Sequence, residues 1–264
     1  MGYGRGASDM ADELTGKVIV LTGGADGIGR ECALAYGREG ARVAIVDRDL
    51  DAARRTAAEL GCGSIALRAD VSDGEMIRIA LTAVLDRFGR IDAVHNNAGI
   101  SSPSKPLHET TEDEWDDVQR TNVKSVYWTT RFAFEALKAS QGCILNTASM
   151  VGLIGQAEHA AYVASKGAMI SLTKAMAVDY ASYSIRVNAI CPAGVWTPML
   201  ERWCTEQRDP DRIRESLDDI HLLGYCPRGD VIADAAVFLL SAKARFMTGC
   251  ILPVSGGAEL GYRR

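Results

Sequence analysis

The sequence predicts an α/β fold in which a parallel β-sheet is covered by helices on both faces. Short apolar runs alternate with stretches of helical periodicity along nearly the whole chain, beginning with residues 18–21 and 27–38. The apolar runs are almost continuous, as in strands that are buried on both faces of a parallel sheet. No linker rich in Pro, Gly or Ser and no repeat divides the 264 residues, so we expect a single domain.

The individual elements follow from the same pattern. Strands are expected at residues 18–21, 42–46, 64–71, 91–95, 143–147, 185–190 and 250–254, and helices at 27–38, 49–60, 72–88, 111–138, 159–180 and 232–240. Asp49, Ser72 and Thr111 stand where a helix N-cap is expected, because their side chains can accept a hydrogen bond from the first turn. Glu75 and Glu114 follow Ser72 and Thr111 at the spacing of a capping box.

A charged segment at about residues 198–228 interrupts this alternation late in the chain. It contains Trp203 and Pro210, and a long insertion at such a point is often an active-site lid. A surface helix pair without a role is the alternative. We expect residues 14–264 to form one domain that carries this lid, preceded by a flexible, Gly-rich and polar arm at residues 1–13.

Composition and charge narrow the class of partner. The net charge is −5 and the pI is about 5.5, without the basic stripe of a protein that binds nucleic acid or anionic membranes. No apolar run reaches the roughly 18–20 residues that a membrane span needs. The seven cysteines are scattered and form no C-x-x-C pair. This favours free thiols in the cytoplasm over disulfides or a metal site, and we expect no metal.

A glycine-rich turn joins the first predicted strand to the first predicted helix. Residues 22–29 read TGGADGIG, with glycines at the spacing G-x-x-x-G-x-G. A pyrophosphate is bound by backbone N–H groups at a helix N-terminus, and glycines leave room for its approach. Gly23, Gly27 and Gly29 therefore predict a dinucleotide site, although a tight turn alone would also use glycine.

The residue at the end of the second predicted strand indicates which dinucleotide binds. Asp47 can accept hydrogen bonds from both hydroxyls of the adenosine ribose and would repel a 2′-phosphate. Asp26 in the glycine turn adds a second negative charge. Arg48 is the opposing observation, since it could pair with a phosphate, but beside Asp49 it is more simply a solvated arginine. The sequence favours NAD over NADP.

A tyrosine and a lysine stand four residues apart in the predicted helix 159–180. Tyr162 and Lys166 therefore project from one helix face. Tyrosine has a pKa near 10, and a neighbouring lysine cation lowers it, so that the phenol can exchange a proton with an alcohol as hydride leaves carbon. Ser149, after the strand 143–147, could hold the substrate oxygen. Asn122 could hold a water or a backbone group in the proton path.

These motifs together resemble the short-chain dehydrogenase/reductase family over the chain from about residue 14 to the end. The resemblance rests on the glycine turn, Asp70-Val71, Asn96-Asn97-Ala98-Gly99, Asn122, Ser149, Tyr162 with Lys166, and Arg186-Val187-Asn188 followed by Pro192. It implies a seven-stranded, doubly wound sheet of Rossmann type with the cofactor at its C-terminal edge. It also implies the catalytic set Asn122, Ser149, Tyr162 and Lys166, and a homotetramer that pairs through the helices carrying Asn122 and Tyr162.

The resemblance completes the expected cofactor site. That site comprises Gly23, Asp26, Gly27, Ile28, Gly29, Asp47, Asp70, Val71, Asn97, Ala98, Gly99, Tyr162, Lys166, Pro192, Val195 and Thr197. The chain departs from the family where Pro192-Ala193 replaces the usual Pro-Gly. Because alanine does not readily adopt a positive φ, a different loop shape is expected there.

Two narrower resemblances leave the substrate open. Residues 195–198, 209–215 and 256–262 resemble the type-14 17β-hydroxysteroid dehydrogenases, whereas Pro192-Ala193, Thr197-Pro198 and Trp203 also resemble aldose dehydrogenases of the L-fucose type. Polar residues in the lid and at the step before the catalytic helix favour a sugar or small polyol, with Ser149, Tyr162, His159 and Trp203 as the substrate residues. A non-catalytic NAD(H)-binding protein is the remote alternative, since such a protein would be expected to lack Tyr162 or Lys166.

Overall fold

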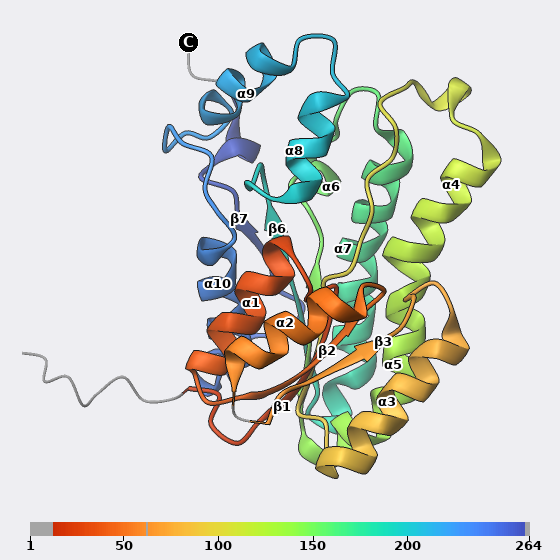
Figure 1. The fold of residues 1–264 in the computed structure, drawn as a ribbon, viewed down its shortest axis with the longest axis vertical. Helices are drawn as coiled ribbons and strands as arrows, with labels where there is room; N and C mark the ends of the chain where they lie inside the picture. Colours follow the sequence, from red (N-terminus) through yellow and green to blue (C-terminus); the bar gives the residue numbers. More distant parts are fainter. Residues whose placement is uncertain (1–12, 62, 262–264) are drawn as a thin grey trace, which may run out of the picture.

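The structure is a computed structural model that describes residues 13–61 and 63–261 (Figure 1). All but the last residue of the predicted N-terminal arm lie outside the described residues. The strands are β1 (Val18–Thr22), β2 (Arg42–Asp47), β3 (Ile65–Arg68), β4 (Ala93–Asn96), β5 (Cys143–Thr147), β6 (Arg186–Pro192) and β7 (Ile251–Val254). They form one parallel sheet of seven strands in the order β3-β2-β1-β4-β5-β6-β7, which confirms the predicted doubly wound sheet.

Helices cover both faces of the sheet. They are α1 (Gly27–Arg38), α2 (Leu50–Leu60), α3 (Gly74–Phe88), α4 (Glu112–Gln119), α5 (Ser125–Ser140), α6 (Val151–Ile154), α7 (Ala160–Tyr180), α8 (Pro198–Thr205), α9 (Pro210–Asp219) and α10 (Asp230–Leu240). α8 and α9 occupy the segment that the sequence marks as a lid, and Figure 1 shows them beyond the sheet at the end where β6 finishes.

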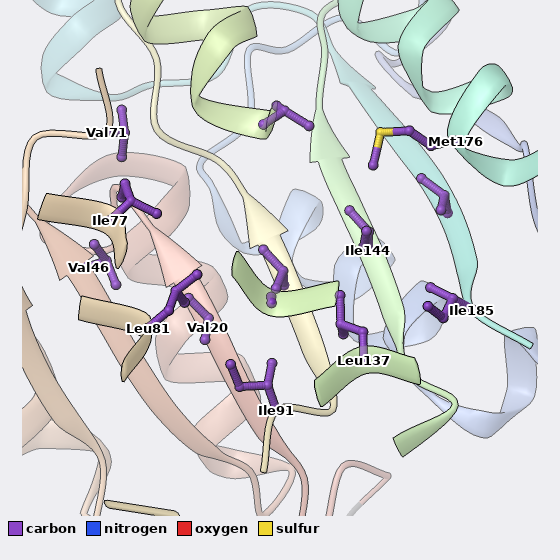
Figure 2. Close-up of a cluster of buried hydrophobic side chains, with 14 of the residues drawn as sticks. Val20, Val46, Val71, Ile77, Leu81, Ile91, Leu137, Ile144, Met176 and Ile185 are labelled. Atoms are coloured by element: carbon purple, nitrogen blue, oxygen red, sulfur yellow. The ribbon is translucent and has the colours of Figure 1, made fainter. Parts of the chain in front are cut away.

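Two apolar cores hold the layers together. Val18 and Val20 of β1 pack with α3, α5 and α7, whereas Ile19 and Leu21 of the same strand pack with α1, α2 and α10. This follows from the two-residue period of a strand, whose successive side chains enter opposite faces. Figure 2 shows the first core, where Val20, Ile77 and Leu137 lie among the packed side chains. Strands buried on both faces explain the nearly continuous apolar runs in the sequence.

The helix starts agree with the sequence in two cases and correct it in a third. Asp49 caps α2 by accepting from the backbone N–H of Ala52, and Thr111 forms the predicted capping box with Glu114. The expectation for Ser72 is wrong. Asp73 is the N-cap of α3, and its carboxylate accepts from the backbone of Glu75 and Met76. A carboxylate one residue nearer to the first turn displaces the hydroxyl from the capping role.

The long helix expected at residues 111–138 is divided in two. α4 ends at Gln119 and α5 begins at Ser125, and the turn between them, Arg120–Lys124, is a π-helix that contains Asn122. An inserted π-turn leaves the apolar periodicity on either side almost unchanged, so the sequence pattern does not reveal it. Single π-turns occur often at functional sites.

The order of the strands places the site. β1 and β4 are neighbours although two strands separate them in sequence, so the connections leave β1 and β4 toward opposite sides. Ligands of open α/β sheets bind at the carboxyl ends of the strands where the order reverses in this way. The glycine turn after β1 and the segment after β4 meet there.

In the part of the chain that the structure describes, no helix combines the length and hydropathy needed to cross a bilayer.

Candidate active site

The glycine turn packs so closely against the segment after β4 that side chains are excluded from it. A Cβ on Gly23, which has φ +67°, would lie 2.8 Å from Cα of Ala98. A Cβ on Gly29 would lie 1.9 Å from the carbonyl oxygen of Gly23, which no movement of a side chain could relieve. These contacts require glycine at both positions and bring the turn to the N-terminus of α1, where backbone N–H groups favour an anion.

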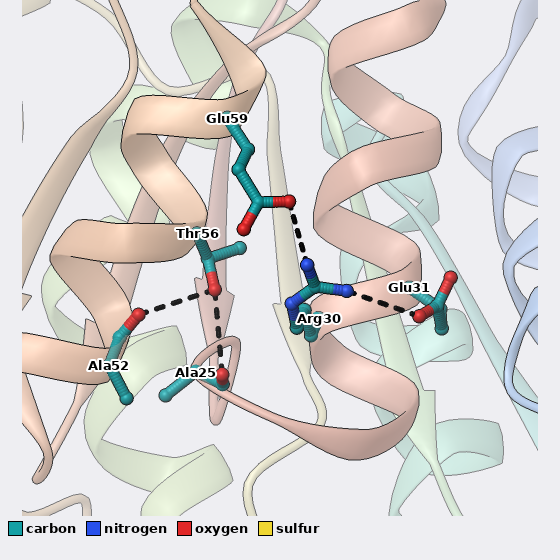
Figure 3. Close-up of polar contacts among 6 residues, drawn as sticks. All are labelled: Ala25, Arg30, Glu31, Ala52, Thr56 and Glu59. Atoms are coloured by element: carbon teal, nitrogen blue, oxygen red, sulfur yellow. Dashed lines mark hydrogen bonds and ion pairs between the residues drawn. The ribbon is translucent and has the colours of Figure 1, made fainter.

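Side chains from β2 and α2 fix the turn at Ala25. The backbone N–H of Ala25 donates to Oδ2 of Asp47 at 3.0 Å, and its carbonyl accepts from Oγ1 of Thr56 at 3.4 Å. Figure 3 shows Thr56 bridging Ala25 and Ala52, and Arg30 of α1 reaching Glu59 of α2. The loop is therefore tied to both flanking elements before any ligand binds.

Asn97, directly after β4, supports the same turn. Its side-chain Nδ2 donates to the carbonyls of Thr22 and Gly23 at 3.2 and 3.1 Å. The hydroxyl of Thr22 in turn accepts from the backbone N–H groups of Asn97 and Ala98 at 3.0 and 3.1 Å. The sequence places Asn97, Ala98 and Gly99 beside the cofactor; the structure puts them next to the glycine turn, with the Asn97 amide already occupied in holding it.

Asp47 ends β2 beside the turn. Its Oδ2 accepts from Ala25 and its Oδ1 from the backbone N–H of Asp49, both at 3.0 Å, which leaves further lone pairs on each oxygen. The pKa of Asp26 is raised, first by partial desolvation and then by the charge of Asp47, while Arg202 of the lid and Arg48 oppose the rise. Negative charge is thus concentrated between the turn and the end of β2.

The remaining predicted cofactor residues lie around this edge. The carboxylate of Asp70 accepts from the backbone and hydroxyl of Ser72 at 2.8 and 2.7 Å, and Val71 is buried. Thr197 caps α8 by accepting from the backbone of Leu200, and a Cβ on Gly27 would lie 3.3 Å from its methyl group. The first residue before the lid therefore lies against the glycine turn. Ile28, Pro192 and Val195 complete the set, the last of them buried.

Tyr162 and Lys166 lie one turn apart on α7, as the spacing predicts. The Lys166 ammonium is 5.6 Å from the centre of the Tyr162 ring and donates to the carbonyl of Thr147 at 2.8 Å. The phenol lies close to the side chain of Ser149. Ser149 makes only long contacts of 3.4 to 3.5 Å to Val151 and Pro192, so its hydroxyl can turn toward a substrate oxygen.

Burial changes the pKa values of both members of this pair. Burial raises the pKa of Tyr162, and the hydrogen bond from Ser149 only partly counters it. Burial lowers the pKa of the Lys166 ammonium to about 8, and the ammonium donates to the carbonyl of Thr147. Ser149 favours the phenolate, and a lysine cation this close to the ring acts in the same direction.

Asn122 is buried in the π-turn and joins three segments. Its Nδ2 donates to the carbonyl of Ile100 and to the hydroxyl of Ser165 at 2.9 and 3.0 Å, and its Oδ1 accepts from the backbone of Ile100 at 2.8 Å. A Cβ on Gly99 would lie 3.2 Å from Asn122 Oδ1 and 3.6 Å from Lys166 Nζ. Asn122 therefore lies close to Lys166 and binds the segment after β4 through its side chain.

His159 and Trp203, the two further predicted substrate residues, contact each other. Trp203 Nε1 donates to His159 Nε2 at 3.0 Å, and His159 Nδ1 pairs with the carbonyl of Ala157 at 3.0 Å. Ser104 also contacts His159 Nε2, at 3.2 Å. Both ring nitrogens of His159 are therefore engaged within the protein, one of them by Trp203 of α8. Glu158 before it has φ +60°, an unfavourable conformation for a non-glycine residue.

The sequence reasoning missed His95 and Thr147 on the sheet beneath the site. His95 is fully buried between Tyr36 and Thr147, at 2.8 and 2.9 Å. The only available signal is a histidine inside a predicted central strand, where apolar residues prevail.

Comparisons with known proteins agree with this geometry. A family model described as enoyl-(acyl carrier protein) reductase matches residues 23–259. The L-fucose dehydrogenase of Bos taurus is 38% identical over 255 residues, which cover 97% of this chain and 94% of that protein. The meso-2,3-butanediol dehydrogenase of Serratia marcescens is 36% identical over 243 residues, which cover 92% of this chain and 94% of that protein.

Among solved structures, a 3-ketoacyl-(acyl-carrier-protein) reductase from Brucella melitensis complexed with NADH superposes with a TM-score of 0.87. It is 35% identical in sequence, and the match covers 93% of this chain and 99% of that chain. These matches span the sheet, the glycine turn and the Ser149–Tyr162–Lys166 group together. The chain therefore belongs to the short-chain dehydrogenase/reductase family, as an alcohol-type dehydrogenase with a Rossmann-type fold.

Proposed function

We propose that this protein is an NAD-dependent dehydrogenase that transfers a hydride between nicotinamide and a sugar or small polyol, such as an aldose related to L-fucose. The observation that carries the proposal is the position of Tyr162, close to Ser149 and one helical turn from Lys166, at the sheet edge that also holds the glycine turn. A proton acceptor and a dinucleotide-binding turn at one edge are what alcohol oxidation requires.

The residues at that edge have the chemistry that NAD needs. The N-terminus of α1 presents backbone N–H groups for a pyrophosphate, and the Asp47 oxygens keep lone pairs for ribose hydroxyls. The same carboxylate, with Asp26 beside it, disfavours the extra phosphate of NADP. The NADH-bound structural relative is consistent with this choice.

The catalytic roles follow from the contacts. Bound NAD would accept the hydride from the alcohol carbon. Ser149 orients the substrate oxygen, and Tyr162 takes the hydroxyl proton in oxidation or returns it in reduction. Lys166, whose pKa of about 8 leaves it largely cationic at pH 7, keeps a positive charge beside the ring. Asn122 holds the segment after β4, which passes close to Lys166 at Gly99.

The substrate class is proposed from the lid. Trp196, Leu200 and Trp203 pack around buried Cys204 and Leu217. The apolar surface that these three side chains bury is therefore used within the lid itself. A long steroid slot would need that surface to be free. A surface groove of about 440 Å³ beside α8 is lined by Trp196 and Pro198 together with Glu201, Arg202, Thr205 and Arg214. Charged groups beside an aromatic ring suit a polyhydroxylated substrate.

NADH formation by the purified protein across aldoses, polyols and hydroxysteroids tests the proposal. Turnover of L-fucose or a related aldose, with steroids inert and NAD preferred to NADP, is the expected result. Turnover of a 17β-hydroxysteroid with sugars inert would replace the substrate class and leave the chemistry intact. NADH binding without turnover of any alcohol or ketone in the panel would instead favour a non-catalytic NAD(H)-binding protein.

Assembly and location complete the proposal. We expect a homotetramer in the cytoplasm, paired through α4, α5 and α7. Tyr127 on α5 and Val178 on α7 expose 48% and 78% of their surface in the monomer, as residues of a contact face do. The cysteines among the described residues are free thiols, which favours a reducing compartment. Size-exclusion chromatography with light scattering measures the oligomeric state, and a mass of four chains is the expected result.

A further inference from the structure

A fully buried histidine lies in the middle of the sheet, directly below the site. His95 belongs to β4, and neither of its neighbouring strands offers it a charged partner. Burial lowers its pKa to about 3, so the ring is neutral at physiological pH. A neutral imidazole has one donor and one acceptor nitrogen, and burying it is favourable only when both are satisfied.

The contacts around His95 favour the tautomer that carries the proton on Nε2. Asn97 donates through Nδ2 to the carbonyl of Gly23, so its Oδ1 is an acceptor, and the hydroxyl of Thr147 donates to that oxygen at 3.4 Å. Thr147 must then accept from His95 Nε2 at 2.9 Å, and His95 Nδ1 must accept from the Tyr36 hydroxyl at 2.8 Å. Each group in the chain then donates to the next, from Tyr36 through His95, Thr147 and Asn97 to the carbonyl of Gly23.

The same chain reaches the catalytic side of the sheet through Thr147. The Thr147 hydroxyl is hydrogen-bonded to His95 and Asn97, and the Thr147 carbonyl accepts from the Lys166 ammonium at 2.8 Å. Thr147 is the last residue of β5, so the side chains that hold its hydroxyl also fix the peptide that Lys166 binds. Directed hydrogen-bond chains of this kind strengthen one another in a medium of low dielectric constant.

We propose that His95 is a positioning residue for the cofactor: acting through Thr147, it orients the Asn97 amide that holds the glycine turn. The side chain of His95 contacts neither the turn nor the reacting atoms, although its backbone carbonyl accepts from the Thr22 hydroxyl at 3.4 Å. Without its Nε2–H, the Thr147 hydroxyl is free to rotate away from Asn97, and the amide that supports Gly23 then loses the donor to its Oδ1 and is held only through its Nδ2. This inference rests on the proposed function only in taking the turn as the dinucleotide site.

Two conservative variants separate the two arms of the ring. In His95→Gln the side-chain nitrogen reaches about the place of Nε2 and can still donate to Thr147. In His95→Asn the amide reaches only about the place of Nδ1, so the contact with Tyr36 survives and the contact with Thr147 is lost. Both remove a ring from the core, and their difference isolates the Thr147 arm.

The measurement is titration of NADH and of NADPH onto the purified protein by fluorescence, together with kcat at saturating cofactor. We expect His95→Asn to raise the Kd of the preferred cofactor about tenfold, as one lost hydrogen bond does, and His95→Gln about threefold or less. kcat should change less than Kd, because the lost support acts equally before and during the reaction. Equal Kd values for the two variants, or values equal to wild type, overturn the proposal.

A double-mutant cycle tests whether His95 acts through Thr147, and Thr147→Val alone, which should also raise Kd about tenfold, keeps the test valid if His95→Asn is poorly folded. Thr147→Val keeps the branched shape of a buried strand residue and removes the hydroxyl that links His95 to Asn97. If His95 acts through Thr147, the His95→Asn change raises Kd less than about twofold in the Thr147→Val background, whereas independent effects would multiply. A full tenfold rise in that background rejects the mechanism.

The tautomer gives a readout that does not depend on cofactor at all. Nitrogen-15 spectra of the protein labelled at its four histidines report which ring nitrogen of His95 carries hydrogen. The Nε2–H tautomer is expected, and Nδ1–H would reverse the chain and reject the inference. Because NADH and NADPH are both titrated, preference for NADPH would overturn the NAD choice alone and leave the role of His95 testable.

Discussion

Trp203 of α8 donates a hydrogen bond of 3.0 Å from Nε1 to Nε2 of His159, in the segment that leads into the catalytic helix α7. His159 Nε2 must therefore be the acceptor, which places the ring proton on Nδ1, opposite the carbonyl of Ala157. Gln207, just after α8, reaches Ser104 at 3.1 Å, and Ser104 contacts the same nitrogen. Hydrogen bonds from Trp203 of α8, and from Gln207 through Ser104, thus converge on one nitrogen of His159.

The hydrogen bond between Trp203 and His159 is expected to hold the lid over the substrate. Trp203→Phe keeps an aromatic ring and loses the donor, so KM for the alcohol should rise about tenfold, with kcat nearly unchanged. Steady-state kinetics measure both. Trp196→Phe is the matched control, because Trp196 packs on the same apolar cluster of the lid. An equal rise in KM for both variants would mean that general packing of the lid, and not this hydrogen bond, is responsible.

Tyr162 is expected to be the proton acceptor. Removal of its hydroxyl in Tyr162→Phe should lower kcat by about 10² to 10⁴-fold and leave NADH binding within about threefold, because the hydroxyl acts on the transferred proton. Single-turnover kinetics and fluorescence titration report the two quantities. Tyr180→Phe, at the far end of the same helix, serves as the control. Unchanged activity in Tyr162→Phe would discard the proposed mechanism.

Asp47 is expected to set the preference for NAD. Asp47→Asn removes the charge and keeps one acceptor oxygen, so kcat/KM with NADP should rise about tenfold or more relative to NAD, because repulsion of the 2′-phosphate is lost. The control is Asp49→Asn, which makes the same change in charge two residues away, at the N-cap of α2. If the ratio for NADP over NAD moves equally in both variants, general surface charge decides and Asp47 has no special role.

His95 is expected to make stability depend on pH. Its folded pKa of about 3 lies below the ordinary value of 6.5, so between these values the unfolded chain binds more protons than the native one. The free energy of unfolding should therefore fall as the pH falls from about 6.5 toward 3, with a contribution of up to about 1.4 kcal/mol per pH unit. Above pH 6.5 this contribution is constant.

Urea unfolding at pH 7, 6 and 5 measures this dependence in wild type and in His95→Gln, which has no titrating group at that position. The difference in unfolding free energy between the two proteins should shift in favour of the variant as the pH falls. Tyr36, which faces His95, does not titrate in this range, because burial raises its pKa well above 10. A difference that is constant with pH would show that His95 does not titrate as a buried neutral group.

The local motifs carry much of the site in the sequence itself. Thr111 with Glu114, Tyr162 with Lys166, and the glycine turn all act over four residues or a short turn, so spacing alone predicts their geometry. The prediction that Ser72 caps α3 is wrong because Asp73 accepts from the same backbone donors. The spacing of residues in the sequence does not show which of two adjacent candidates will form the cap. Ala193, which replaces glycine, is accommodated without a positive φ.

The sequence by itself determined the alternation of strands and helices, the parallel sheet, the dinucleotide turn and the Tyr–Lys pair, because each depends on periodicity or on neighbours along the chain. Only the tertiary structure decided the contacts between distant segments: Trp203 with His159, 44 residues apart, and His95 with Tyr36 and Thr147, 59 and 52 residues apart. The π-turn at Asn122 and the raised pKa of Tyr162 belong to the same group. Burial and hydrogen-bond direction arise when packed layers exclude water, and no local pattern encodes which side chains will then face one another.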